Sequence, residues 1–164
     1  AMKVLSTGAA LAMDQLAEAR RAEGASLLAM LSGHLDTVEA LSEKSAAIAA
    51  TQPGLIKVKL QKQLEELDRE GRVDAERFAA EAALSAARAD VREELDRLAA
   101  HVKSGRDLLR TGSPAGRKID FLAQELNREA NTLCSKSASL ELTNAGLSLK
   151  GVIDQFKEQA ANVE

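Results

Sequence analysis

The chain has 164 residues and a net charge of −3, with 45% hydrophobic and 29% charged residues; it contains three Phe but neither Trp nor Tyr. The acidic balance argues against a surface coated for nucleic acid, and the scarcity of β-branched and aromatic runs argues against a sheet. No apolar run approaches the ~20 residues that a membrane-spanning helix needs. The single cysteine, Cys134, excludes an internal disulfide and fits a reducing cytoplasm.

Hydrophobic residues recur at helical spacing along most of the chain and predict about five helices. In chain order, we expect them at about 8–49, 55–69, 74–109, 116–137 and 139–163. The predicted breaks are Gln52-Pro53-Gly54, 70–74, 111–114 and a softer one at 135–137. Asp74 and Ser113 are expected as helix N-caps, and Pro114 suits a first helical position.

The first predicted helix is about 60 Å long at 1.5 Å per residue, which is too long for a compact domain of this size. Such a helix needs an antiparallel partner or another subunit. We therefore expect an all-α fold of long antiparallel helical hairpins, similar to a coiled-coil bundle. The expected division is into residues 1–72, a long helical hairpin, and residues 73–164, a C-terminal helical domain.

The segment 116–137 reads GRKIDFLAQELNREANTLCSKS and carries two stripes at helical spacing. One stripe is apolar and typical of a core-facing side: Ile119, Leu122, Leu126, Ala130 and Leu133. The other is rich in amides and Arg, whose hydrogen-bonding geometry is directional: Arg117, Asp120, Gln124, Asn127 or Arg128, Asn131 and Ser135. Cys134 lies beside the apolar stripe and is interpreted as a small core residue.

A second polar stripe lies in the predicted helix 74–109. Its members share one face because three or four residues separate them: Asp90, Glu94, Arg97 and His101. Carboxylates and an imidazole on one face could hold a divalent metal. A solvated ladder of ion pairs is the commoner origin of such a pattern. His101 is the better candidate for acid–base chemistry, and His34 is interpreted as an incidental surface residue.

For nucleic acid, the usable cations of 116–137 are Arg117, Lys118, Arg128 and Lys136. Basic side chains spread along one helix can contact successive phosphates. The alternative is ion pairing with the acidic side chains of the same segment. Aromatic platforms for stacking bases are expected to be absent.

Four strings of the sequence resemble one known family. GRKIDFLAQELNREANTLCSKS is similar to the signature of the YicC-like bacterial endoribonucleases, and EELDRLAAHVKSGRDLL, from Glu93 to Leu109, resembles the helix before it. LAEARRAEGASLLAML, from Leu16, and IDQFKEQAANVE, from Ile153, are similar to an upstream stretch and to the end of the family's chains. The resemblance implies the C-terminal half to two-thirds of an RNase assisted by Mn²⁺ or Mg²⁺. It also implies a homo-oligomer, commonly a hexamer.

Two hypotheses follow from the residues and the resemblance together. In the first, the chain is a metal-dependent endoribonuclease, whose catalytic residues are Glu94, His101, Asp120, Glu125 and Glu129. Glu94, Asp120 and either Glu125 or Glu129 would hold the metal. The predicted RNA-phosphate ligands are Arg97, Arg117, Lys118, Arg128 and Lys136. Gln124, Asn127 and Asn131 would orient the metal ligands. In the second, the chain is a helical oligomerisation module without activity of its own.

Overall fold

The computed structural model describes residues 2–67, 74–112 and 116–163, and within these ranges the chain forms six helices and no strand. This confirms the predicted all-α fold. The helices are α1 (Met2–Ala49), α2 (Gln52–Leu67), α3 (Ala75–Arg88), α4 (Arg92–Thr111), α5 (Gly116–Lys136) and α6 (Leu140–Ala160). None of them combines the length and hydropathy that a bilayer-crossing segment requires.

Two predicted helix boundaries are wrong. The break after α1 lies at Ala50 and Thr51, and Pro53 falls inside the first turn of α2, where its missing N–H costs no hydrogen bond. The helix predicted over 74–109 is interrupted between α3 and α4. There the side chain of Asp90 accepts a hydrogen bond from the backbone N–H of Arg92 at 3.0 Å. Such local bonding competes with the helical ladder and starts a new helix.

The other expected helix ends have mixed outcomes. The softer break at 135–137 is confirmed, because α5 ends at Lys136 and Ser139 caps α6 by accepting a hydrogen bond from the N–H of Leu142 at 3.2 Å. Asp74 occupies the N-cap of α3 but makes no side-chain capping bond there. The N-cap at Ser113, the helix start at Pro114 and most of the break at 70–74 lie outside the described residues.

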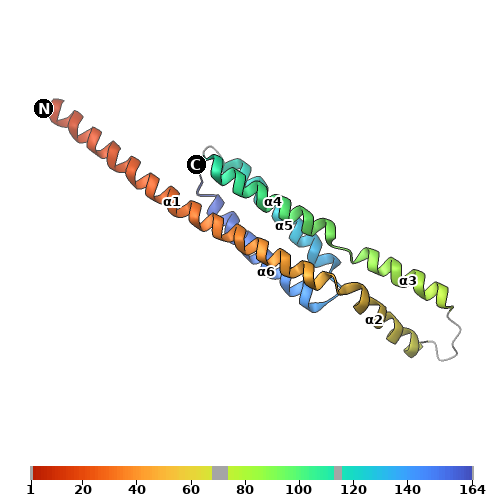
Figure 1. The fold of residues 1–164 in the computed structure, drawn as a ribbon. Helices are drawn as coiled ribbons and strands as arrows, with labels where there is room; N and C mark the ends of the chain where they lie inside the picture. Colours follow the sequence, from red (N-terminus) through yellow and green to blue (C-terminus); the bar gives the residue numbers. More distant parts are fainter. Residues whose placement is uncertain (1, 68–73, 113–115, 164) are drawn as a thin grey trace.

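A four-helix bundle forms the centre of the molecule (Figure 1). Its helices are α1, α4, α5 and α6. Each of them packs against two of the others, in the order α1, α4, α5, α6 and back to α1. Leucine, isoleucine and alanine side chains from all four helices fill one core, with Phe156 as its largest member. The predicted boundary between residues 72 and 73 lies outside the described residues and stays a prediction. The buried part of α1 shares its core with α4, α5 and α6.

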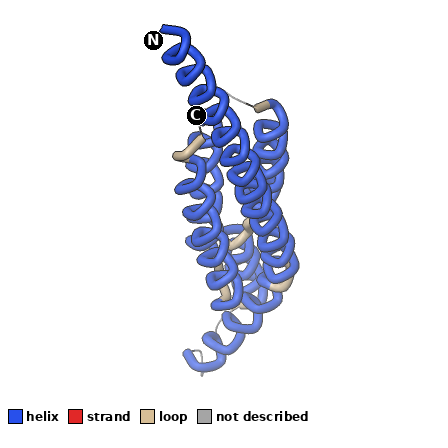
Figure 2. Tube along the Cα trace, turned by 90° about the vertical axis from the view of Figure 1, so that its left-hand side faces the viewer, coloured by secondary structure: helices blue, strands red, loops and turns tan. Residues whose placement is uncertain are grey.

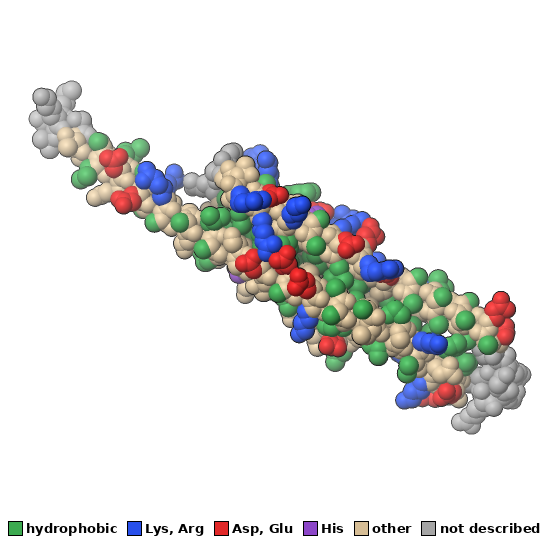
Figure 3. All heavy atoms as spheres, viewed as in Figure 1, with side chains coloured by type: hydrophobic (Ala, Val, Ile, Leu, Met, Phe, Trp, Pro, Cys, Tyr) green, Lys and Arg blue, Asp and Glu red, His purple; other side chains and the backbone are tan. Residues whose placement is uncertain are grey.

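Two extensions leave the bundle at opposite ends (Figures 1 and 2). At one end, α2 and α3 pack against each other as an arm. At the other, the first half of α1 projects beyond its neighbours. The side chains of residues 7–26 are exposed except for the half-buried Ala17. Figure 3 shows hydrophobic, acidic and basic groups together on this projection.

Close helix contacts fix α4 between its neighbours. A Cβ atom placed on Gly105 would lie 2.9 Å from side-chain carbons of both Leu35 in α1 and Leu122 in α5. The absent side chain therefore lets α4 approach both helices. On the outside of the same contact, Arg106 donates hydrogen bonds to Glu39 at 2.7 and 3.1 Å and to Asp36 at 2.7 Å.

Candidate metal-binding site

The polar faces predicted for α4 and α5 meet in the structure. The two helices are neighbours in the bundle and run antiparallel. Near one end of the pair of helices, Glu94 is hydrogen-bonded to Lys136. Further along, Arg97 is hydrogen-bonded to Glu129. In the middle, His101 lies near Glu125 and Glu129. Each pair brings a polar residue of one helix opposite a polar residue of the other. The space between α4 and α5 is therefore lined by titratable groups.

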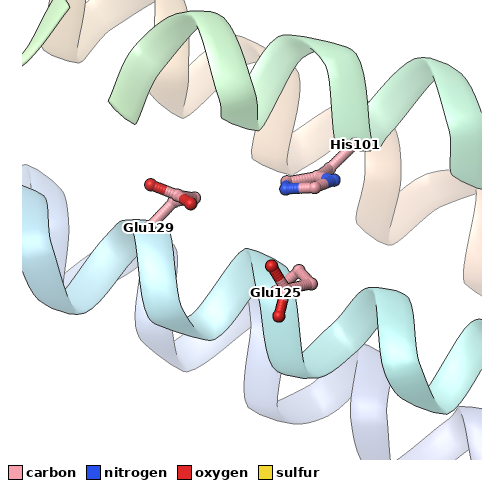
Figure 4. A group of neighbouring side chains, drawn as sticks. All are labelled: His101, Glu125 and Glu129. Carbon is pink, nitrogen blue, oxygen red and sulfur yellow. The ribbon is translucent and has the colours of Figure 1, made fainter. Parts of the chain in front are cut away.

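His101, Glu125 and Glu129 form a group of potential metal ligands (Figure 4). One ligand atom from each residue lies within 4.8 Å of those from the other two. Ligands on opposite sides of one Mg²⁺ ion are ~4.2 Å apart, so small side-chain movements would bring this group into coordination. His101 comes from α4, whereas Glu125 and Glu129, four residues apart, share one face of α5.

The group fits a divalent ion chemically. One imidazole and two carboxylates match the oxygen and nitrogen donors that Mn²⁺ and Mg²⁺ accept. His101 and Glu125 are half-buried and thus partly open to solvent, whereas Glu129 is only 3% exposed. Three protein ligands leave coordination positions open, as a catalytic metal site requires.

Arg97 holds the buried carboxylate of Glu129. Its Nη1 donates to Oε1 of Glu129 at 3.4 Å, and its Nη2 donates to Glu93 at 2.5 Å. The negative charges of Glu93 and then Glu129 raise the pKa of Arg97. Arg97 was predicted to bind RNA phosphate, but in this structure its guanidinium is shared between two carboxylates.

Glu94 lies outside the ligand group. It is 4% exposed, and its Oε1 accepts a hydrogen bond from Nζ of Lys136 at 2.8 Å. Its Oε2 is buried with no hydrogen-bond partner among the described residues. The hydrogen bond to Glu94 is the main cause of a raised pKa at Lys136. The predicted metal ligand and the predicted phosphate contact are therefore paired with each other.

Asp120 and the three predicted orienting amides lie on other sides of α5. Asp120 is exposed and accepts a hydrogen bond from Gln124 at 2.9 Å. Asn127 donates to Asp154 of α6 at 3.0 Å, and Asn131 donates to Asn127 at 3.0 Å. These bonds run along α5 and toward α6. Glu125 and its predicted alternative Glu129 both belong to the group that the described residues form, whereas the predicted ligands Glu94 and Asp120 do not.

The remaining predicted cations of α5 lie on its exposed surface. Arg117, Lys118 and Arg128 are exposed, and none of them forms an ion pair within the described ranges. Arg117 and Lys118 line a groove of about 570 Å³ between α4 and α5, together with His101. The groove therefore includes His101, one of the three candidate ligands, in its wall. The sequence also did not predict that Phe121 would be exposed in its wall.

Comparison with known proteins identifies relatives of this chain. The family model described as "Endoribonuclease YicC-like, C-terminal" matches residues 29–164, a range that includes α4, α5 and α6 entirely. The chain is 38% identical over 146 residues to the "Probable endoribonuclease YicC" of Haemophilus influenzae (strain ATCC 51907 / DSM 11121 / KW20 / Rd). That match covers 88% of this chain and 50% of that protein.

A second relative, the "Probable endoribonuclease YicC" of Clostridioides difficile (strain 630), is 31% identical over 154 residues, which cover 93% of this chain and 53% of that protein. The chain thus spans about half the length of the curated relatives that it matches. The matched region contains every residue of the candidate site. The chain belongs to the YicC-like endoribonuclease family and carries its C-terminal region.

Proposed function

We propose that this chain carries the metal-binding part of an endoribonuclease that cleaves phosphodiester bonds of RNA with the help of Mn²⁺ or Mg²⁺. Both relatives are named as probable endoribonucleases, which supports RNA as the substrate. The observation that carries the proposal is the convergence of His101, Glu125 and Glu129 within 4.8 Å, on facing helices, beside an open groove with basic walls.

In this proposal, Glu125, Glu129 and His101 hold one divalent ion. The ion supplies a Lewis acid for a phosphoryl oxygen and lowers the pKa of a water molecule. Because its imidazole contributes a ligand nitrogen, His101 takes this role in place of the proton transfer expected from the sequence. Arg97 orients the carboxylate of Glu129, while the exposed Arg117 and Lys118 neutralise RNA phosphates that enter the groove.

Cleavage of a fluorescently labelled single-stranded RNA, with and without added Mn²⁺, tests this proposal. Glu125→Gln removes one ligand charge and keeps the side-chain volume, so we expect a loss of rate on the order of 100-fold. Asp120→Asn is the matched control, because Asp120 is an exposed carboxylate of the same helix. If the wild-type chain cleaves RNA and Glu125→Gln cleaves it equally fast, this metal assignment is wrong.

A second candidate function is assembly into a homo-oligomer, and the exposed first half of α1 favours it. Leu11, Met13 and Leu16 project from this half of the helix and are each more than half exposed. An isolated helix gains most of its stability from packing, so this segment is suited to contact a second copy of the chain. Light scattering of the chain tests assembly, and Leu16→Glu should reduce the measured mass if α1 mediates it.

A further inference from the structure

Phe121 differs from the other two phenylalanines of the chain. Phe156 lies in the core with 1% exposure, and Phe78 is half-buried on the arm, whereas Phe121 is 63% exposed. An exposed apolar residue needs no explanation by itself. Phe121, however, lies in the wall of the α4–α5 groove that also contains His101. Its ring is therefore open to a molecule that reaches the candidate metal site.

The position of Phe121 along α5 relates it to the ligand group. Phe121 precedes Glu125 by four residues, so about 6 Å, slightly more than one helical turn, separates them along the axis. The groove holds about 570 Å³ and is lined by α4 residues from His101 to Thr111 and by α5 residues from Arg117 to Leu122. It thus extends from His101 toward the connection between α4 and α5, past the ring of Phe121.

The charges around the ring are complementary to nucleic acid. Arg117 and Lys118, four and three residues before Phe121, line the same groove and form no ion pair within the described part of the chain. The acidic lining residue Asp107 is paired with Arg110. Among the described residues, these two cations of the groove therefore have no ion-pair partner. An aromatic ring beside such cations combines stacking with phosphate contacts, as proteins that bind single-stranded nucleic acid do.

We propose that Phe121 is a stacking platform for one unpaired base of single-stranded RNA, next to the nucleotide held at the metal site. Arg117 and Lys118 contact the phosphates on either side of the stacked base. Bases of a duplex are stacked on one another and hidden from such a ring, so the subsite selects single-stranded segments. This inference rests on the proposed function, because it takes RNA as the ligand of the groove.

Equilibrium binding without divalent metal tests the platform separately from cleavage. The probe is an oligouridylate of about ten nucleotides with one 2-aminopurine, whose fluorescence falls when the base stacks. We expect wild-type protein to quench the probe and Phe121→Trp to keep both quenching and affinity. Phe121→Leu keeps an apolar side chain without the ring, and it should weaken binding about 5- to 100-fold and abolish quenching. Leu147→Ala, an exposed apolar residue of α6, is the control.

Two results would overturn the inference. One is equal affinity and quenching for wild type and Phe121→Leu. The other is a Phe121→Leu protein that binds RNA as wild type does but has a lower oligomeric mass in light scattering. That result would make Phe121 a contact between protein copies. Neither result bears on whether Glu125→Gln abolishes cleavage. Conversely, a chain that cleaves no RNA but shows ring-dependent quenching would reject the nuclease proposal and retain the stacking platform.

Discussion

Nζ of Lys136, in the last turn of α5, lies 2.8 Å from Oε1 of Glu94, in the first turn of α4. Glu94 is almost fully buried, and its second oxygen has no partner among the described residues. The pair therefore joins the two helices that carry the candidate metal ligands. Lys136 is the hydrogen-bond and ion-pair partner of Glu94 among the described residues, so its charge compensates for the burial of the carboxylate.

We expect Lys136→Met to lower the free energy of unfolding by about 1–3 kcal/mol, because it leaves the buried carboxylate of Glu94 unpaired. The double variant with Glu94→Leu should recover most of this loss, since it replaces both charges by apolar groups. Urea denaturation followed by circular dichroism measures the free energy of unfolding of both variants. Lys103→Met, at an exposed position of α4, is the control. A Lys136→Met protein as stable as this control would contradict the prediction.

The contact of Arg106 with Asp36 and Glu39 predicts how stability depends on pH. The hydrogen bond from Arg106 lowers the pKa of Glu39 from its ordinary value of 4.5. Glu39 thus binds a proton more readily in the unfolded chain than in the folded one. Its contribution to stability is fully present above pH 4.5 and is lost as the pH falls through the lower pKa of the folded state.

We therefore expect Arg106→Met to be less stable than wild type at neutral pH. The difference in stability between the two proteins should become smaller below pH 4.5. Urea denaturation at a series of pH values gives the comparison. Lys103→Met is the matched control, because Lys103 is an exposed cation of the same helix that forms no ion pair within the described ranges. Identical acid profiles for wild type and Arg106→Met would refute the prediction.

Gln52 connects the arm to the bundle, which yields a third prediction. Its buried side chain donates a hydrogen bond to the carbonyl of Ala89 at 3.0 Å and accepts one from the N–H of Ala138 at 2.5 Å. It thereby links the start of α2, the end of α3 and the connection between α5 and α6. Gln52→Leu removes both bonds at an estimated cost of about 1–3 kcal/mol.

Hydrogen exchange measured on peptides of α2 and α3 should be faster in Gln52→Leu, by about 5- to 100-fold where exchange occurs through local opening. Peptides of α5 and α6 that are far from Ala138 should change less. Gln61→Leu is the control, because Gln61 is exposed and bonds only to Glu65 within the described ranges. Equal exchange in the arms of the two variants would show that Gln52 does not hold the arm.

The sequence predicted which faces of α4 and α5 would carry polar groups, but it did not predict which of these groups would meet. Spacing within one helix places Glu94 and His101 on the same side, and the structure agrees. Their partners depend on how far the antiparallel helices are shifted along each other. Packing sets that shift, for instance where Gly105 lets Leu122 approach α4. The resulting register places Lys136 opposite Glu94 and leaves His101 opposite Glu125.

The break between α3 and α4 shows a second limit. Apolar residues continue at helical spacing through 84–102, so periodicity alone predicts one uninterrupted helix. The interruption depends on the side chain of Asp90 bonding to the backbone of Arg92, which competes with a local helical bond of similar strength. Asp near a helix start is a usual signal for such bonding between a side chain and the backbone. In this sequence, the strong apolar repeat around it concealed the signal.

The last prediction separates the potential ligand group of the structure, His101, Glu125 and Glu129, from the expected ligands Glu94 and Asp120. Glu129→Gln removes the charge of a buried ligand, so we expect Mn²⁺ affinity, measured by electron paramagnetic resonance or calorimetry, to fall on the order of 10- to 100-fold or more. Asp120→Asn should bind Mn²⁺ as wild type does, because Asp120 is exposed and bonds to Gln124. Arg97→Met should change Mn²⁺ affinity less than Glu129→Gln, since Arg97 contacts the ligand and not the ion. If Asp120→Asn lost Mn²⁺ affinity and Glu129→Gln retained it, the ion would have to bind on the side of α5 that faces away from His101.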